Sequence, residues 1–474
     1  MTRHLLLIIA TLLHTALAAQ ELSFDMAREV MMSNNLEIEA ARKAVDVAKL
    51  ELRAARGLRL PNIDLIADYT LMQRDIGIDL CGSKSALSNT MHSIINKGIS
   101  DGIITQEFAS LIAEGVSPLL SADWRFTLQK RSTFVGAATI TQPIYMGGRI
   151  DAAINTAEIV VQKAEQTLRS VINSKLTKLV EYYYGVVLAM EDVELRKGIV
   201  SGFEHHLSDA EAMEDEGLIA NSELLYGKYR LSEAERELHS ATNKLLLAKE
   251  ALAQILGLEN IDNLTDRIFI VESIYNIDYY VENTVNLNPI ILNTRSDFAL
   301  TKQGVKAARA DLLPEVAAMG GAVLASHNFT NLIPRWSIGI GLRLNIFNGL
   351  DKERRYVAAK RTSDAIYTIM EEVTNRVTLL TESEYYNTIN SLKDVNMMQS
   401  SIEFAQAYLN TKEEGFKEGI TPSAELIDAE LELQAARLKQ LLAGFDFCKY
   451  LAQLLEAAGL SESFDEYREK AIFL

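Results

Sequence analysis

Two carboxylates, Glu425 and Asp428, lie three positions apart in a segment with helical spacing. This spacing places both side chains on one face of a helix, close to its first turn. Paired carboxylates there can attract cations, or they can simply compensate the positive end of the helix dipole. The second interpretation requires no function, so the pair alone does not define a site.

Sequence motifs for catalysis are scarce. Residues 98–102 match the G-x-S-x-G pattern, but the run MHSIINK precedes them where a nucleophile elbow needs a hydrophobic strand. His205 and His206 are adjacent, so on a helix they diverge, cannot bind one metal, and are expected on a solvated surface. Residues 339–341 (GIG) lack the third glycine of a dinucleotide site. We therefore expect no enzyme activity, no cofactor and no metal site.

Composition and the N-terminus bound the compartment and the partners. The net charge of −17, from 64 acidic and 47 basic residues, argues against nucleic acid as a partner. Residues 1–18 have basic, apolar and small-residue segments in the order of a cleaved secretory signal. No cysteine follows the cleavage site, and Cys81 and Cys448 lie far apart, so neither a lipid anchor nor a disulfide framework is expected. No later stretch has about eighteen consecutive apolar residues, so strands must play any membrane role.

The second half of the chain repeats the first. EGLIANSELL (216–225) resembles EGITPSAELI (418–427), and Gly147 matches Gly349, in both cases at an offset of 202 residues. More than a hundred residues keep this register without a gap. The chain is therefore predicted to be one duplicated unit.

Upstream, the repeat continues with a different offset. AARGLRLP (54–61) resembles AARADLLP (307–314) at an offset of 253 residues, and Asn35 matches Asn288 at the same offset. Since the two offsets differ by 51, the first copy carries an insertion of 51 residues at about 73–125. The predicted parts are a signal peptide (1–18), a first repeat (19–258), an equatorial connector (259–284), a second repeat (285–460) and a C-terminal tail (461–474).

Each copy contains two strand-like runs. Apolar and other residues alternate over about ten positions in 63–71 and in 336–346. This period suits a strand with one face toward lipid and one toward water, although a soluble β-layer gives the same pattern. The four runs lie after Pro61, after Pro314, before Gly147 and before Gly349.

Long helices follow these strands. Apolar and small residues recur at spacings of four and three in 150–171 and 356–380, which predicts a left-handed coiled coil. A helix from about 148 to about 210 would be about 90 Å long, which suits a shaft. Two shorter helices, at about 222–256 and 285–312, add up to a similar length.

Four strands cannot close a barrel, because the smallest membrane barrels use about eight and lipid does not tolerate open edges. The chain must therefore pool its strands with copies of itself. Two copies give eight strands and three give twelve, and only the wider closure leaves a lumen.

The chain resembles the TolC-like outer-membrane efflux protein family. The resemblance rests on the signal, the proline before each first strand, the motif QPIYMGGR (142–149), the Gly-x-x-x-x-x-Glu-Leu turns and the duplication. It implies an α+β fold: a homotrimer that shares a 12-stranded outer-membrane β-barrel, continued into the periplasm by a long antiparallel α-helical coiled-coil tunnel. It also implies outer-membrane lipid, a periplasmic adaptor (membrane fusion) protein and an inner-membrane transporter of RND, ABC or MFS type as partners.

The resemblance assigns roles to the turns and to the carboxylates. The turns at 217–225 and 419–428 become tips that contact the adaptor, with Asn221 and Thr421 as expected helix N-caps. Glu425 and Asp428 become a ring of six carboxylates at the tunnel's closed end, without the basic partner that relatives have near Thr421. Phe416 either narrows this mouth or packs between helices. The candidates are the gate residues Glu425, Asp428 and Phe416; the tips Gly217, Leu218, Ile219, Gly419, Ile420 and Thr421; and the junctions Pro143, Gly147, Gly148 and Gly349.

The sequence therefore predicts a passive exit duct in the outer membrane that extends into the periplasm. Small-molecule efflux is the favoured role, and type I protein secretion is also possible on the sequence. The alternative is a periplasmic coiled-coil scaffold or adaptor protein without a membrane barrel. Topology places the insertion outside the cell, where it acts as a plug or cover, or binds a receptor or partner.

Overall fold

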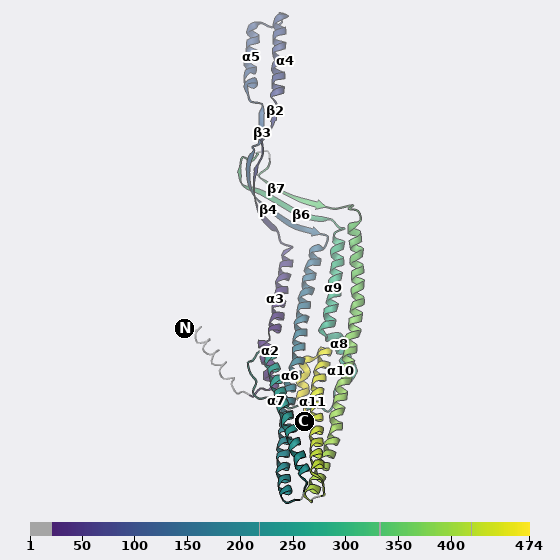
Figure 1. Ribbon diagram of the computed structural model, residues 1–474. Coiled ribbons are helices and arrows are strands. Elements are labelled where there is room, and N and C mark those ends of the chain that lie inside the picture. Colours follow the sequence, from purple (N-terminus) through teal and green to yellow (C-terminus); the bar gives the residue numbers. More distant parts are fainter. Residues whose placement is uncertain (1–20, 218, 331–332, 419) are drawn as a thin grey trace, which may run out of the picture. The chain divides into compact units, whose positions relative to one another are not determined.

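The computed structural model describes residues 21–217, 219–330, 333–418 and 420–474. The chain divides into two compact units. The sheet unit contains residues 54–152 and 306–356, and the helical unit contains the rest of the described chain (Figure 1). The predicted signal peptide, 1–18, lies outside the described residues. Among the residues that the structure describes, no helix is both long enough and apolar enough to cross a membrane.

An antiparallel sheet of four strands forms the centre of the sheet unit, and its strands confirm the four predicted runs. In spatial order they are β1 (Asn62–Leu71), β4 (Ser132–Met146), β6 (Glu315–His327) and β7 (Trp336–Arg343). β7 ends before the predicted limit of 346, because Arg343 pairs with Glu315, the first residue of β6, and no partner strand continues beyond it. Within the described chain, β1 and β7 are edge strands, each paired on one side only.

The strand register separates an apolar face of this sheet from a more polar one. Residues paired directly across strands point to the same face. Two rows on one face are apolar or small throughout: Ile63, Ile140, Gly320 and Ile338, then Leu65, Ala138, Ala322 and Trp336. The row between them, on the other face, is Asp64, Thr139, Gly321 and Ser337. The large apolar side chains of the edge strands are exposed, so none of the residues that the structure describes covers this apolar face.

The insertion extends the ribbon formed by β1 and β4. β2 (Ile76–Asp79) pairs with β3 (Arg125–Gln129), and between them lie the helices α4 (Cys81–Ser100) and α5 (Gln106–Ser121). The G-x-S-x-G residues, 98–102, end α4 rather than forming a strand-to-helix elbow. The Ser100 hydroxyl donates to the Lys97 carbonyl at 2.9 Å, as is common at a helix end.

The helical unit is built from the two repeats. The first supplies α2 (Phe24–Asn34), α3 (Leu36–Gly57), α6 (Arg149–Asp215) and α7 (Asn221–Leu256); the second supplies α8 (Ile277–Leu287), α9 (Pro289–Ala310), α10 (Asp351–Lys417) and α11 (Ser423–Ala458). The two longest, α6 and α10, have 67 residues each, about 100 Å at 1.5 Å per residue, which confirms the predicted long helices. The expected connector at 259–284 contains β5 (Phe269–Ile270) and most of α8, and the tail contains η1 (Ser461–Ser463), α12 (Phe464–Arg468) and β8 (Ile472–Phe473).

An asparagine at the α2–α3 junction ties the first repeat together. The Asn35 Oδ1 atom accepts from the backbone N–H groups of Glu37 (3.0 Å) and Ile38 (3.3 Å), which begin α3. Its Nδ2 group donates to the Ile255 carbonyl, near the end of α7, at 3.4 Å. The side chain therefore caps one helix and binds the end of another.

The second repeat makes the same bonds at the α8–α9 junction. The Asn288 Oδ1 atom accepts from the N–H groups of Ile290 (2.8 Å) and Ile291 (3.3 Å), and its Nδ2 group donates to the Ala457 carbonyl at 2.8 Å. These partners stand at the offsets of 253 and 202 residues found in the sequence. The duplication therefore extends to individual hydrogen bonds.

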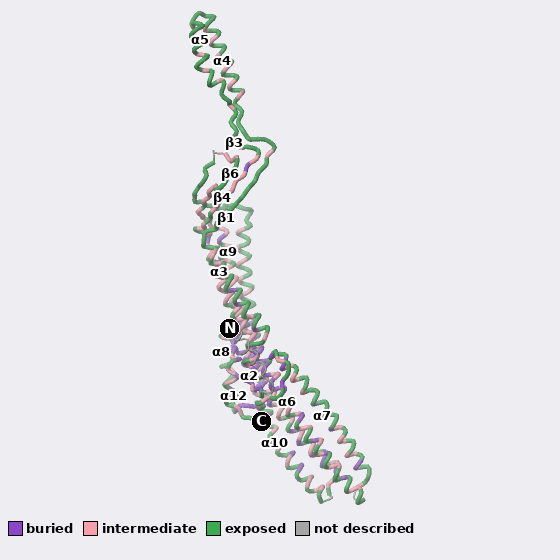
Figure 2. The backbone as a smooth tube through the Cα atoms, turned by 90° about the vertical axis from the view of Figure 1, so that its left-hand side faces the viewer, coloured by how far each residue is buried: buried purple, intermediate pink, exposed green. Residues whose placement is uncertain are grey.

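The main core lies in a belt where the helical repeats meet β5 and the C-terminal tail (Figure 2). Tyr183 and Tyr184 are fully buried against the rings of Phe24, Phe269 and Phe464. These two tyrosines therefore belong to the core. Three carboxylates surround one guanidinium of this belt: Arg468 bonds to Asp25, Asp266 and Asp465. Arg28 bonds to Asp465 as well. Burial of both rings and charges makes the belt the most constrained part of the helical unit.

Glycines lie where the chain passes from the last strand of each repeat into a long helix. Gly147, Gly148 and Gly349 have φ of +64°, +90° and +75°. A Cβ atom at Gly147 would lie 2.7 Å from the Ala310 carbonyl oxygen, so only glycine fits there. In the repeat, Leu350 matches Gly148 and keeps its positive φ, at +62°, although a side chain disfavours this conformation.

Two further features surround the first junction. The pairing of β4 with β6 shifts register between Pro143 and Tyr145, which fits a proline that cannot donate to the ladder. At the start of α6, Arg149 bonds to the carboxylates of Asp311 and Glu315. These ion pairs join the start of the helix to the start of β6.

We expect Gly147→Ala to destabilise the protein by about 1–3 kcal/mol, because a left-handed residue gains a side chain and that side chain meets backbone. Gly349→Ala should lower the free energy of unfolding by only about 1 kcal/mol, the cost of placing a side chain on a left-handed residue, since its surroundings are open. Gly57→Ala, at an open position at the end of α3, is the control. Thermal melting of the purified protein in detergent measures the order. Equal melting temperatures for the Gly147 and Gly349 variants would contradict the steric argument.

Candidate functional site

The turn between α10 and α11 closes on one backbone carbonyl. The N–H groups of Ile420 and Thr421 both donate to the Gly415 carbonyl, at 2.8 and 3.1 Å. Gly415 has no side chain, and the Thr421 hydroxyl lies where a Cβ atom would be. Thr421 is not the helix N-cap that we expected, because Pro422 occupies that position without a side-chain bond. Ile420 is 74% exposed.

The turn between α6 and α7 begins with a glycine that ends α6. Gly217 has the left-handed φ expected of a helix C-cap, +75°, and its N–H donates to the Glu214 carbonyl at 2.8 Å. The N-cap of α7 is Ala220 rather than the expected Asn221. Ile219 is half-buried. Leu218 and Gly419, the remaining tip candidates, lie outside the described residues.

Glu425 has a basic partner that sequence reasoning missed. The Lys412 Nζ atom, on α10, donates to the Glu425 carboxylate at 2.5 Å and lies 5.3 Å from the centre of the Tyr408 ring. The hydrogen bond to this carboxylate, together with its charge, raises the pKa of Lys412. The charge of Glu425 is therefore compensated from the facing helix.

Asp428 faces the other hairpin. The Arg230 guanidinium, on α7, lies 3.9 Å from the Asp428 carboxylate and 5.9 Å from the centre of the Tyr226 ring. At this distance the attraction is weak, and the Asp428 side chain is 68% exposed. Glu425 and Asp428 thus share a helix face but bind to different hairpins.

A third contact joins α6 to α11. The His206 Nε2 atom lies 3.2 Å from the Glu430 carboxylate, and both side chains are largely buried. Gly202, one turn before His206, leaves the space that the Glu430 carboxylate occupies. Our expectation that His206 lies on a solvated surface was therefore wrong, because α11 covers it; its neighbour His205 is exposed.

Phe416 packs between α10 and α11. Its ring contacts a cluster of buried residues from both helices: Ala405, Leu409, Leu426, Ala429 and Leu433. It also meets the His206 ring edge-on, with 6.4 Å between ring centres. Of the two roles considered from sequence, the contacts within this chain correspond to packing.

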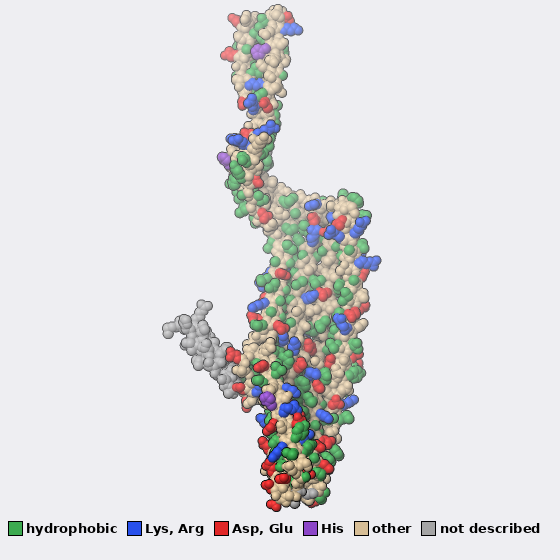
Figure 3. Space-filling model, viewed as in Figure 1, with side chains coloured by type: hydrophobic (Ala, Val, Ile, Leu, Met, Phe, Trp, Pro, Cys, Tyr) green, Lys and Arg blue, Asp and Glu red, His purple; other side chains and the backbone are tan. Residues whose placement is uncertain are grey.

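The tip is thus an acidic region held together by two small buried clusters and a few ion pairs. Asp and Glu side chains gather at the end of the helical unit that carries the two turns (Figure 3). Three pairs meet on α11, two of them from the first hairpin: Arg230 with Asp428 and His206 with Glu430. An exposed ion pair such as Arg230–Asp428 contributes about 0–1 kcal/mol. The largely buried His206–Glu430 pair and the apolar cluster of Ile199, Phe203, Ala234 and Ile427 are costlier to separate. Within the described residues, no cluster of His, Cys, Asp and Glu could hold a metal ion.

Comparisons with known proteins agree on one family. The sequence profile of the outer membrane efflux protein family matches residues 28–258 and 281–460. The cobalt-zinc-cadmium resistance protein CzcC of Cupriavidus metallidurans is 23% identical over 66% of this chain and 74% of its own length. For the outer membrane protein TolC of Vibrio cholerae the values are 21%, 65% and 73%, and for the alkaline protease secretion protein AprF of Pseudomonas aeruginosa 22%, 64% and 65%.

Solved structures share the fold. The Campylobacter jejuni outer membrane channel CmeC aligns with a TM-score of 0.71 at 13% identity, over 94% of this chain and 88% of its own. CusC, a protein that forms a transmembrane channel, aligns with a TM-score of 0.71 over 94% and 95% of the two chains. The strand pairs, the long helical hairpins and the profile lead to the same assignment: this chain belongs to the outer membrane efflux protein family and is an outer-membrane protein with the fold of these channels.

Proposed function

We propose that three copies of this chain form a passive exit duct for substrates that an inner-membrane transporter and a periplasmic adaptor deliver. The open sheet carries this proposal, because β1 and β7 each have a free edge and an apolar face next to them. Lipid does not tolerate free backbone groups, so these edges must pair with other copies. Three copies supply twelve strands, enough to enclose a lumen. Family membership argues against the alternative of a periplasmic scaffold without membrane strands.

In this proposal the two hairpin tips form the periplasmic mouth, and Ile219, Ile420 and Thr421 contact the adaptor. An isoleucine as exposed as Ile420 is apolar surface that a partner can cover. The junction glycines let each strand feed directly into the tunnel wall. The insertion, by topology, lies outside the cell. The chain itself has no catalytic role, in keeping with a family of channels.

We propose that the mouth opens when the first hairpin separates from α11. The contacts that must break are the ion pairs of Arg230 with Asp428 and of His206 with Glu430. The apolar packing of Ile427 against Ile199, Phe203 and Ala234 must break as well. Lys412 moves with Glu425, since both belong to the second hairpin. Phe416 then supports the mouth by packing behind it.

The acidic tip favours cationic or zwitterionic small solutes over anions, so small-molecule efflux is the favoured cargo class. A relative named for resistance to cobalt, zinc and cadmium supports this choice. Secretion of protein is the second candidate, supported by a relative named for alkaline protease secretion at nearly the same identity. RND, ABC and MFS transporters are all compatible inner-membrane partners.

The purified protein should conduct ions in planar bilayers, and Glu425→Gln with Asp428→Asn should raise its single-channel conductance several-fold and reduce its preference for cations. Of the single changes, Asp428→Asn should have the larger effect on conductance, because Asp428 faces Arg230 of the other hairpin. Glu432→Gln, also exposed on α11, is the matched control. A double variant that behaves like the unchanged protein would rule out the gate, and no conductance by any form would rule out the duct.

Ile420→Asp should weaken docking of the adaptor, because it places a charge where the proposed partner covers an apolar side chain. A loss of about 1.4 kcal/mol corresponds to tenfold weaker binding, which we expect to see as increased accumulation of a cationic dye in cells. Ile420→Val keeps the contact and serves as the control. Normal export by Ile420→Asp, at an unchanged amount of assembled protein, would remove this residue from the docking surface.

A further inference from the structure

The inserted hairpin is well formed but has almost no core of its own. Half-buried α4 residues recur at spacings of three and four and face α5: Cys81, Lys84, Ser88, Met91, Ile95 and Gly98. Ala109 is the only fully buried residue that the structure describes in either helix. Two helices that bury so little cannot offset the entropy of their own ordering, so a further surface must pack against them.

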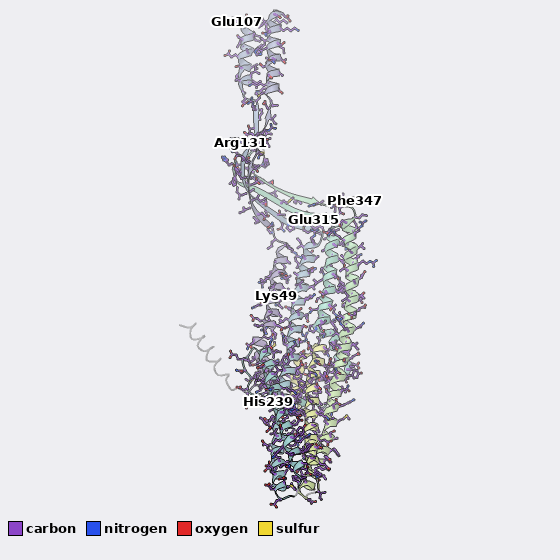
Figure 4. All side chains as sticks on the ribbon, viewed as in Figure 1. Lys49, Glu107, Arg131, His239, Glu315 and Phe347 are labelled. Carbon is purple, nitrogen blue, oxygen red and sulfur yellow. The ribbon has the colours of Figure 1, made fainter. Side chains whose placement is uncertain are left out.

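Local contacts nevertheless hold the hairpin in one conformation. At the turn, Gly102 has φ of +66°, and a Cβ atom at Gly98 would lie 2.8 Å from the Ile104 side chain. The Thr105 hydroxyl caps α5 by accepting from the Phe108 N–H at 3.3 Å. At the base, the Leu80 N–H donates to the Trp124 carbonyl at 3.1 Å, which seats the hairpin on β2 and β3. Figure 4 shows Glu107 at the end far from these strands.

One side of this hairpin is apolar and the other is polar. In an antiparallel pair, residues that precede the facing positions lie on the same side of both helices. On that side stand five large apolar residues, between 39 and 64% exposed, which we call the apolar face: Leu87, Ile94, Phe108, Leu111 and Leu119. The α4 residues on the opposite side, which we call the polar face, are Ser85, Asn89, His92 and Asn96, all exposed.

Charge also indicates that the apolar face is covered. Between residues 81 and 121 the charged side chains are Lys84, Lys97, Asp101, Glu107 and Glu114. Of these, Lys97 alone lies on the side of the apolar face, near the turn, because it precedes the facing residue Gly98. A helical hairpin surrounded by water normally carries many more charges, of both signs. An apolar face with so few charges beside it, and with no cover among the described residues, is typical of an interface.

The size of the face selects the partner. Stable interfaces between separate proteins use about 20–30 residues a side, so five side chains cannot hold an independent protein. Copies that are already joined through their sheets can use so small an interface, because the joining raises the effective concentration of one hairpin near the next to about millimolar. β1, which continues through a short turn into β2, is an edge strand that must meet another copy. In the proposed trimer, on which this inference rests, the three hairpins therefore stand around one axis.

We propose that the α4–α5 hairpins of three copies pack their apolar faces together into a six-helix bundle that covers the outer end of the duct. The polar faces then point outward to water. The hairpin is in this case a cover contributed by a second and third copy of the chain, rather than a receptor-binding element. Solutes leave between the β2–β3 ribbons that carry the three hairpins, or when the bundle loosens.

The proposal can be tested in the full-length protein by cysteine crosslinking between copies. Cys81→Ala removes the accessible native thiol, and Cys448 is buried with its pKa raised to about 12 by burial, so it does not interfere. In this background, Ile94→Cys and Leu111→Cys are oxidised separately in whole cells. Because a disulfide needs Cα atoms within about 7 Å, covalent dimers form only where copies meet. Asn96→Cys, on the polar face of the same helix, is the matched control.

We expect at least tenfold more covalent dimer from Ile94→Cys or Leu111→Cys than from Asn96→Cys. Both positions are tested, so a folding defect at one leaves the other. An assembled trimer that gives no dimer at either apolar position, or equal dimer at Asn96→Cys, overturns the six-helix bundle and leaves the duct standing. Absence of any trimer in the unchanged protein would instead contradict the proposed function.

Discussion

Unpaired backbone at a strand edge is the constraint on which the rest of this molecule depends. β1 and β7 each leave one row of N–H and C=O groups without a partner in the described chain, next to a face with exposed Ile63, Leu65, Trp336 and Ile338. In water such an edge promotes aggregation, and in lipid it is not tolerated. The sheet is therefore incomplete as a monomer. The proposed trimer follows from this incompleteness, and so do the shared lumen and the proximity of the inserted hairpins.

Stability is unevenly distributed along the helical unit, and this distribution suits a duct with a movable mouth. The belt around Tyr183, Tyr184 and Phe269 is fully buried and is tied to the C-terminal tail through Arg468. The tips depend on two small clusters, one around Leu409 and Leu426 and one around Phe203 and Ile427, and on partly exposed ion pairs. Regions with few buried contacts open at low cost, whereas buried belts do not. Motion is therefore expected at the tips, with the belt as the fixed reference.

Periodicity and repetition made the fold predictable. Alternation located the first and last sheet strands, and repetition located the other two. The 3.5-residue repeat located α6 and α10, and the two offsets recur in the bonds of Asn35 and Asn288. Local details were harder. β7 stops where its partner strand ends, and the positive φ of Leu350 is visible only through its match to Gly148. The candidate site was predicted least well, because Lys412, Arg230 and His206 reach their partners across turns or between hairpins. The rotation of one helix against another decides such contacts, and sequence spacing does not fix it.

The most direct test of this account is the mass of the protein particle extracted from membranes with mild detergent, measured by native mass spectrometry or light scattering corrected for detergent. The account predicts that extraction requires detergent and that the particle contains three chains. A single chain that stays dispersed in plain buffer would contradict it, because a lone sheet with two free edges and an uncovered apolar face would then be stable in water.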